Sequence, residues 1–269
     1  MSVRDDSDKC MKRLLKIWLR LTLGSFQVAT VTRAGALVFI VAKLLRFLLF
    51  LLVVILIVSQ TKVLAGYNLT QSLIFFMTFN VIDTLTQLLF RDVYRFRPKI
   101  ISGDFDLNLV QPVNALGRVL LGGADPMDLV VLVPYSGLLI YFLLQIQFSF
   151  VQMLTYLFLI INGLLIATAF HILVLALGIL TTEIDHAVMI YRDLESMARF
   201  PVDIYKEPLR GFITFIIPVG IMMTFPPKAL FGQLSYLLII SSFMICGGLL
   251  WFSLFLWQQA LKRYTSAPS

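Results

Sequence analysis

The most constraining feature of this chain is a series of apolar stretches, each long enough to cross a lipid bilayer. A hydrocarbon core about 30 Å thick requires on the order of 20 apolar residues in a helix. Five stretches reach this length: residues 41–64, 69–90, 129–148, 151–180 and 234–257. A shorter stretch, 212–225, ends at Pro226-Pro227, so we expect it to span either by beginning near Leu209 or by local thinning of the membrane. The sequence therefore predicts an all-α, polytopic membrane protein with six transmembrane helices, the fifth at 209–225.

Basic residues collect at alternate gaps between these stretches, which predicts the orientation of the chain. With the N-terminus in the cytoplasm, the inner side receives the N-terminal segment, the gap 91–128, the gap before the fifth span with Arg192, Arg199, Lys206 and Arg210, and the C-terminal tail. The outer side receives only Lys62 and Lys228. By the positive-inside rule, both termini are predicted to be cytoplasmic in a multi-pass protein of the plasma membrane. Lys43 and Arg46, within the first span, are expected to snorkel to the inner interface.

Composition supports this class and excludes several functions. Hydrophobic residues make up 59% of the chain and charged residues 14%, which would leave a soluble protein with too apolar a surface. The net charge of +7 is explained by inner-face residues that meet anionic lipid headgroups, without a nucleic acid partner. There is no G-x-x-x-x-G-K-[ST] phosphate loop and no Cys/His cluster. We therefore expect one transmembrane domain over residues 1–269, with no enzyme activity, metal or cofactor of its own.

The N-terminal region, 9–33, is predicted to form an amphipathic helix. Its basic residues recur at three- and four-residue steps and form one stripe: Lys9, Lys12, Arg13, Lys16 and Arg20. Apolar residues lie opposite them: Met11, Leu14, Leu15, Trp18 and Leu21. A helix of this kind lies flat in the membrane interface. It is either a topology anchor or an elbow that moves with the first span.

The polar gap 91–128 is too long for a simple hairpin and is predicted to project into the cytoplasm. Large apolar residues alternate there with polar ones: Ile100, Ile101, Phe105, Leu107, Leu109 and Val110 with Asp104, Asp106 and Asn108. A solvated loop does not need so many apolar side chains. The pattern therefore favours a short amphipathic element that presses one face into a groove of a partner.

Two motifs in this order resemble one branch of the type-2 ABC-transporter permeases. The first is Gly103-x-Phe105-Asp106-x-x-Leu109-x-x-Pro112, which follows Arg95-x-Arg97. The second is Arg199-Phe200-Pro201 with Tyr205, Leu209-Arg210, Thr214, Pro218 and Pro226, similar to that branch's entry into its fifth helix. One departure concerns the segment 226–233, which leaves little room for the two re-entrant half-helices that many members carry before the sixth span.

The resemblance implies a six-helix exporter permease that forms half of a translocation path. It implies pairing with a second copy or a sister permease, and with two separate nucleotide-binding ATPase subunits that hold ATP and Mg²⁺. The implied ATPase-coupling interface comprises Arg95, Arg97, Ile101, Gly103, Phe105, Asp106, Leu109 and Pro112. Phe105 and Leu109 are expected to be its apolar anchors, because a few large side chains usually dominate an interface. The alternative is that these residues fold back onto the chain's own helix ends.

Polar residues inside the predicted spans are candidates for the transport path or the dimer seam. Asn80 and Asp83 lie one turn apart in the second span, where an isolated carboxylate is costly unless it faces protein, water or a partner. Alternatively, Asp83 reaches interfacial water or Arg91 while Asn80 bonds to a neighbouring helix. Asn162 and His171 in the fourth span are weaker candidates, since packing alone explains such residues.

Other functional classes fit the sequence less well. A membrane-embedded lipid enzyme requires clustered carboxylates or histidines, which the chain lacks. A secondary transporter should show internal repetition with interrupted spans at matching positions. No repeat is visible, although the short fifth stretch fits that class. A secondary transporter or a non-catalytic membrane scaffold subunit therefore remains the alternative to an ATP-driven permease.

Overall fold

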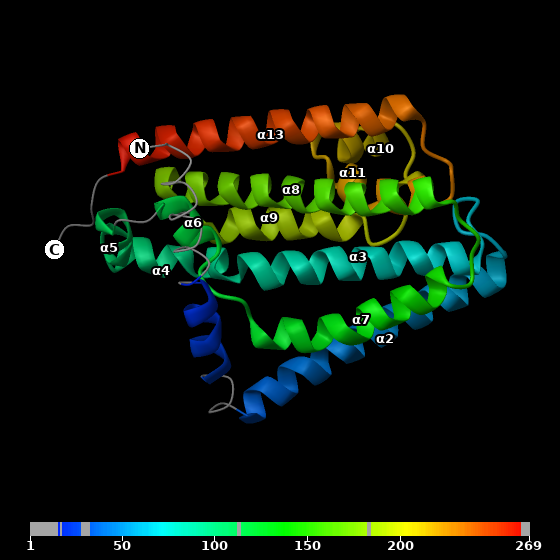
Figure 1. Cartoon of the computed structure of the whole chain (residues 1–269), viewed down its shortest axis with the longest axis horizontal. Helices are drawn as coiled ribbons and strands as arrows, with labels where there is room; N and C mark the ends of the chain where they lie inside the picture. The colour runs from blue at the N-terminus through cyan, green and yellow to red at the C-terminus, as the bar shows by residue number, and fades with distance from the viewer. Residues whose placement is uncertain (1–15, 17, 28–32, 112–113, 182–183, 265–269) are drawn as a thin grey trace.

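The computed structural model describes residues 16, 18–27, 33–111, 114–181 and 184–264, and these residues form a helical bundle without a β-strand (Figure 1). The long helices are α2 (Arg33–Thr61), α3 (Leu69–Phe90), α7 (Pro126–Leu143), α8 (Phe150–Thr181), α9 (Ile184–Met197) and α13 (Tyr236–Arg263). Between α3 and α7 lie η1 (Arg91–Arg95), α4 (Phe96–Ile101), α5 (Asp104–Val110) and α6 (Ala115–Leu120). Between α9 and α13 lie η2 (Val202–Ile204), α10 (Leu209–Gly211), η3 (Phe212–Ile216), α11 (Val219–Met223) and α12 (Phe225–Leu230).

Five helical stretches among the described residues are long and apolar enough to cross a membrane. They are Ala34–Thr61, Leu69–Ile101, Pro126–Leu143, Phe150–Thr181 and Tyr236–Arg263. They coincide with the first, second, third, fourth and sixth predicted spans. The prediction of an all-α multi-pass membrane protein is therefore confirmed, with five of the six expected spans present as continuous helices.

Polar capping residues fix where several of these helices begin. Asn68 caps α3 in a capping box: its side chain accepts from the backbone of Gln71, whose side chain in turn accepts from the backbone of Asn68. Asp125 caps α7, and Pro126 stands at its first turn. Ser235 caps α13 by accepting from the backbone N–H of Leu238. Each cap satisfies a backbone donor that has no partner within its own helix.

The predicted fifth span is not one helix in the structure. Residues 209–230 form four short helical elements, α10, the π-helical η3, α11 and α12, which pack beside the part of α8 that follows Phe150 (Figure 1). Pro218 has no N–H to continue the helical hydrogen bonds past η3, and Pro226-Pro227 occupies the first turn of α12. The predicted fifth span, 209–225, is therefore corrected to these four short helical elements, which precede the last long helix.

Residues 184–208 belong to a predicted gap outside the bundle, but the structure places helix α9 within the bundle. It runs back alongside α8 (Figure 1). Beyond its end, the Arg199 guanidinium lies 3.9 Å from the ring centroid of Phe50 and 5.6 Å from that of Phe79. Both rings lie near the midpoints of α2 and α3. Arg199 is therefore among the membrane helices, not in a loop outside them.

The segment after α9 continues to the end of the bundle where α2 meets α3. There the Tyr67 hydroxyl donates to Asp203 over 2.9 Å, and the Lys228 ammonium donates to the other oxygen of Asp203 over 2.9 Å. Burial, followed by the charge of Asp203, raises the pKa of Tyr67 well above its ordinary value. We call this the Tyr67 end and the opposite one, which carries α4, α5 and α6, the α5 end. Lys206 and Arg210 follow Asp203 and lie at the Tyr67 end.

The N-terminal helix is described from residue 18 to residue 27, and it lies across the direction of the long helices (Figure 1). It packs at the α5 end, where the backbone N–H of Ala124 donates to the Thr22 hydroxyl over 3.1 Å. This crosswise placement agrees with a helix in the plane of an interface. Of the predicted basic stripe, Lys9, Lys12 and Arg13 lie outside the described residues.

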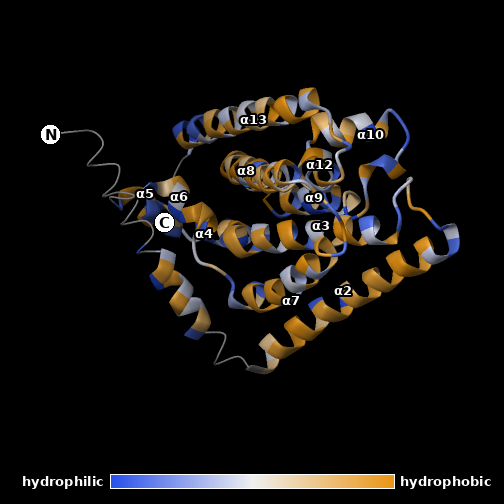
Figure 2. Ribbon diagram, turned by 45° about the vertical axis from the view of Figure 1, so that its right-hand side comes forward, coloured by the Kyte–Doolittle hydropathy of each residue, from blue (hydrophilic) through white to orange (hydrophobic). Residues whose placement is uncertain are grey.

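Helices α2 and α13 lie on the outside of the bundle and present apolar surface (Figure 2). Only 11% of the apolar window of α2 is buried within the chain, against 72% for α3. α2 packs through one side with Phe47, Val54 and Val58, which join α3 and α7 in a common core. The exposed apolar face of α2 requires lipid or another protein around it, because water would not solvate so many large side chains.

Gly163 sets the close approach of α8 and α11. A Cβ at this position would lie 2.8 Å from the backbone oxygen of Met222, an atom that cannot rotate away. We predict that Gly163→Ala lowers the unfolding free energy by about 1–3 kcal/mol, since overpacking a tight contact forces the backbone to shift. Thermal unfolding of the solubilised protein measures this change. Gly137→Ala in α7 is the control, because nothing lies within 4 Å of its Cβ position; equal melting temperatures for the two variants would contradict the assignment.

Candidate functional site

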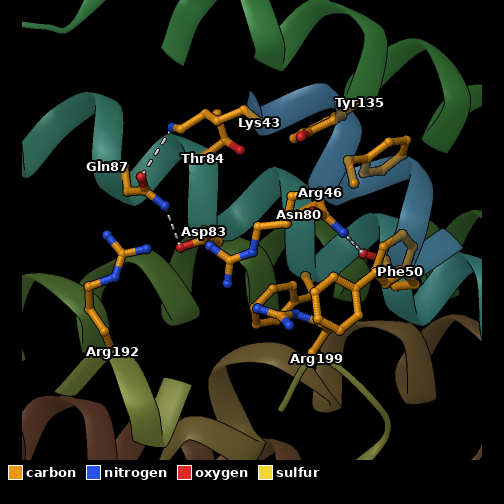
Figure 3. Close-up of a pocket in the computed structure, with 13 residues that line it drawn as sticks. Lys43, Arg46, Phe50, Asn80, Asp83, Thr84, Gln87, Tyr135, Arg192 and Arg199 are labelled. Atoms are coloured by element: carbon orange, nitrogen blue, oxygen red, sulfur yellow. Dashed lines mark hydrogen bonds between the residues drawn. The ribbon is translucent and has the colours of Figure 1, made fainter. Parts of the chain in front are cut away.

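A charged cavity lies among α2, α3 and the α9 segment (Figure 3). It has a narrow part of about 70 Å³ and a wider part of about 330 Å³. Arg46, Phe79, Asp83, Arg192 and Arg199 line both parts. At 1.5 Å per residue, Asp83 lies about 21 Å along α3 from its start at the Tyr67 end. Charged side chains at this depth mark substrate or ion paths in membrane proteins more often than structural features.

A chain of polar contacts closes one wall of the cavity. The Lys43 ammonium forms an ion pair with Asp128 and donates to the Gln87 side chain over 3.2 Å. The Gln87 amide donates to Asp83 over 2.8 Å (Figure 3). Asp128 is fully buried, so its carboxylate depends on Lys43 for charge compensation. Lys43 therefore points to a buried carboxylate in the first turn of α7, and its snorkelling to the inner interface stays a prediction.

Three guanidinium groups reach the same space from three segments of the chain. Arg46 comes from α2, Arg192 from α9, and Arg199 from the turn that follows α9 (Figure 3). None of the three forms an ion pair with, or donates a hydrogen bond to, another residue that the structure describes. The snorkelling of Arg46 likewise stays a prediction. The ring faces of Phe50 and Phe79 hold the guanidinium of Arg199.

Two of the four predicted intramembrane residues belong to this cavity. Asn80 and Asp83 both line it, and the Asn80 amide also donates to the backbone oxygen of Phe76 over 2.7 Å. Asn162 instead lies buried between α8 and α13, where its amide donates to the backbone oxygen of Ser242 over 3.4 Å. His171 is likewise buried, and its Nδ1 bonds the backbone oxygen of Ala167 over 2.8 Å. Asn162 and His171 therefore form hydrogen bonds within the chain and are not among the residues that line this cavity.

Sequence reasoning missed the cationic half of the cavity. Hydropathy places Arg192 and Arg199 in the gap before the fifth span, on the cytoplasmic side of the membrane. A usable signal was present, since Arg192, Glu195, Ser196 and Arg199 follow one another at helical spacing and share one face. The structure turns that face toward the cavity, where Glu195 is 4% exposed.

The Lys43–Asp128 pair yields a direct test. We predict that Lys43→Met lowers the unfolding free energy by about 3–5 kcal/mol, because it leaves the buried Asp128 carboxylate uncompensated. The double variant Lys43→Met/Asp128→Leu should recover most of that loss, since it removes both charges. Denaturant unfolding of the four proteins in one detergent provides the cycle. Additive effects of the two substitutions would show that the pair makes no stabilising contact.

The predicted coupling segment forms the α5 end, and it corrects the role of Phe105. This side chain is fully buried, with its ring 5.0 Å from Phe96, 5.1 Å from Tyr264 and 6.3 Å from Trp257. Phe105 therefore joins α5 to α4 and to the end of α13 and is not available to a partner's groove. The alternative that this residue folds back onto the chain's own helix ends is the one that the structure supports.

Other apolar residues of this segment are exposed. Ile101 is 63% exposed, Leu107 65% and Val110 84%, whereas Leu109 is 38% exposed. Leu107 and Val110 lie one turn apart on α5 and share a face that points away from Phe105. We call these two residues the outer face of α5.

The polar residues predicted in the coupling segment occupy distinct places. Gly103 adopts φ 77° between α4 and α5, a left-handed conformation that favours glycine, so its predicted role in a turn fits the structure. Arg97 pairs with Asp185 at 2.5 Å and thereby connects α4 to the start of α9. Arg95 is exposed, and Asp106 stands in the first turn of α5. Pro112 lies outside the described residues.

Comparison with known proteins gives one family. The family model described as "ABC-2 family transporter protein" matches residues 37–268, from the second turn of α2 to beyond the end of α13. No curated protein and no solved structure matches the chain. Among the described residues, no group of three or more His, Cys, Asp or Glu side chains is placed to hold a metal ion.

Proposed function

This chain belongs to the ABC-2 family of transporter proteins, and we propose that it is the permease subunit of an ATP-driven exporter. In this proposal it forms half of the translocation path and pairs with a second copy or a sister permease. Separate nucleotide-binding subunits hold ATP and Mg²⁺ and dock on the α5 end. The observation that carries the proposal is the outer face of α5, an exposed apolar surface on a short helix that is fixed to the membrane helices.

The distribution of basic residues supports a cytoplasmic α5 end in the plasma membrane. This end carries Arg91, Arg95, Arg97, Lys99, Arg118, Lys262 and Arg263. The Tyr67 end carries Lys62, Lys206, Arg210 and Lys228. The bias persists after Lys206 and Arg210 move to the outer side, so the positive-inside rule still favours cytoplasmic termini.

Lys206 distinguishes this topology from the one that the sequence predicts. In a cysteine-free background, we predict that Lys206→Cys is labelled by an impermeant thiol reagent from outside intact cells, as Lys62→Cys is. Lys262→Cys should react only after the cells are permeabilised. All three side chains belong to exposed residues, so lack of labelling reflects the side of the membrane and not burial. Labelling of position 206 only after permeabilisation would contradict the placement of this segment at the Tyr67 end.

The contacts of the α5 end suggest how ATPase closure would reach the membrane helices. Phe105 packs on Trp257 near the end of α13, so a displacement of α5 would act on the last long helix. Arg97 pairs with Asp185 at the start of α9, which leads to Arg192 and the cavity. In the proposed mechanism, the docked ATPase moves α4 and α5 together, and the inner ends of α9 and α13 follow.

Two substitutions on α5 separate docking from stability. We predict that Leu107→Asp weakens association with the ATPase subunit roughly tenfold or more, because a charge replaces an apolar contact at the interface. Its melting temperature should stay close to that of the unmodified protein, since Leu107 is 65% exposed. Phe105→Ala should instead lower the unfolding free energy by about 3–5 kcal/mol through loss of core packing.

The association is measured by titrating the purified ATPase, identified by its phosphate loop, onto the purified permease in nanodiscs. Ile204→Asp is the matched control, an exposed apolar residue at the Tyr67 end that is 42% exposed. The permease alone should hydrolyse no ATP, and Ile204→Asp should bind the ATPase normally. Normal binding by Leu107→Asp would rule out the outer face of α5 as the docking surface.

A further inference from the structure

The cavity of Arg46, Arg192 and Arg199 holds many hydrogen-bond donors that have no acceptor among the described residues. Each guanidinium presents five N–H donors. None of these donors bonds to another residue that the structure describes. Stacking on Phe50 and Phe79 uses the flat face of the Arg199 guanidinium and leaves its N–H edge available.

Such a set of donors within a membrane bundle calls for a hydrogen-bond acceptor that carries negative charge. An unpaired guanidinium among apolar helices costs several kcal/mol unless water or an anion accompanies it. The planar fork of arginine matches phosphate and carboxylate oxygens in pairs, which a lysine ammonium does not.

The carboxylates around the cavity limit the charge of the anion. Asp83 and Glu195 line it and offset two of the three guanidiniums, while Asp128 compensates Lys43 from behind the wall. Asp193 also belongs to the lining, and like Arg46 it is exposed. The three carboxylates thus balance the three guanidiniums in formal charge, so the site tolerates the single negative charge of a phosphodiester better than a dianion.

Size and access favour the headgroup of an amphiphile. The wider part of about 330 Å³ lies at the lower end of ligand-pocket volumes and accepts a headgroup without acyl chains. Arg46 lines this part and is also exposed on α2, a helix that packs through one side only. The cavity therefore opens beside α2, where the tails of a bound lipid could stay in the bilayer.

We propose that this cavity binds the phosphodiester headgroup of an anionic amphiphile through Arg46, Arg192 and Arg199. The inference rests on the proposed function: in a permease, the amphiphile bound here is the cargo or a lipid held in the translocation path. The donors are the three guanidiniums. Asp83, which accepts a hydrogen bond from the Gln87 amide, contributes a negative charge to the site.

The test is an anisotropy titration of purified full-length permease in detergent with fluorescent phosphatidylglycerol. Fluorescent phosphatidylcholine with the same chains is the zwitterionic comparison. We expect phosphatidylglycerol to bind at least about tenfold tighter, and Arg192→Gln and Arg199→Gln each to weaken it about tenfold or more, as for a lost charged hydrogen bond. Asp83→Asn should raise the affinity severalfold, because it removes a like charge from the site.

Arg210→Gln is the matched control, since Arg210 pairs with Glu207 at the Tyr67 end, away from the cavity. It should leave the affinity within about twofold. Arg46→Gln separates loss of binding from loss of folding. Because Arg46 is exposed, this variant should bind more weakly while it keeps its melting temperature. Affinity for phosphatidylglycerol that is unchanged in Arg46→Gln and Arg192→Gln would overturn the proposal.

A competition experiment distinguishes binding of a lipid phosphodiester from binding of free phosphate. Inorganic phosphate should displace the lipid only at concentrations at least about a hundredfold higher than glycerophospholipid competitors require. Displacement at equal concentrations would assign the site to free phosphate and overturn the amphiphile. ATPase association measured on the same variants keeps the two proposals apart: arginine-dependent lipid binding without any ATPase association would contradict the proposed function alone.

Discussion

The cost of placing charge inside a membrane is the constraint on which this structure depends. Arg192, Glu195 and Arg199 lie on or just after a helix that runs alongside α8, so none of them can face lipid tails without a large penalty. The bundle meets this constraint by turning their face toward α2 and α3. A polar cavity results because the guanidiniums and carboxylates do not pair closely enough to fill the space. The short helices of residues 209–230 then pack on α8 and complete the wall of the bundle at the Tyr67 end.

The same helix connects the two functional regions. α9 begins beside α4, where Asp185 pairs with Arg97, and it ends at the cavity. The Arg97–Asp185 pair is largely exposed and contributes little stability, but its geometry places α4 against the start of α9. Phe105 contributes the stronger link, since its ring is fully buried against α4 and the end of α13. The proposed docking surface at the α5 end thus rests on the two helices that move in the proposed mechanism.

The candidate sites were partly predictable, and the failures have physical causes. Asn80 and Asp83 were identified because a carboxylate in an apolar stretch is unusual and costly. Phe105 was misjudged because alternation along a short segment identifies apolar residues but not the side on which the chain's own core lies. Its ring is large and takes the interior position, while Leu107 and Val110 on the other face remain exposed.

The sequence by itself determined the membrane class, the five continuous spans and the capped starts of α3, α7 and α13, because hydropathy and capping depend on neighbours within a few residues. Only the tertiary structure decided the places of α9 and of residues 209–230. Local composition marks α9 as a surface helix and 212–225 as an apolar one. Their positions depend instead on partners far away in the chain: Phe50 and Phe79 beneath Arg199, and Met222 against Gly163. A charged helix lies within the bundle when distant side chains surround it with a polar cavity. The shared face of Arg192, Glu195 and Arg199 marks its polar side but does not identify those distant partners.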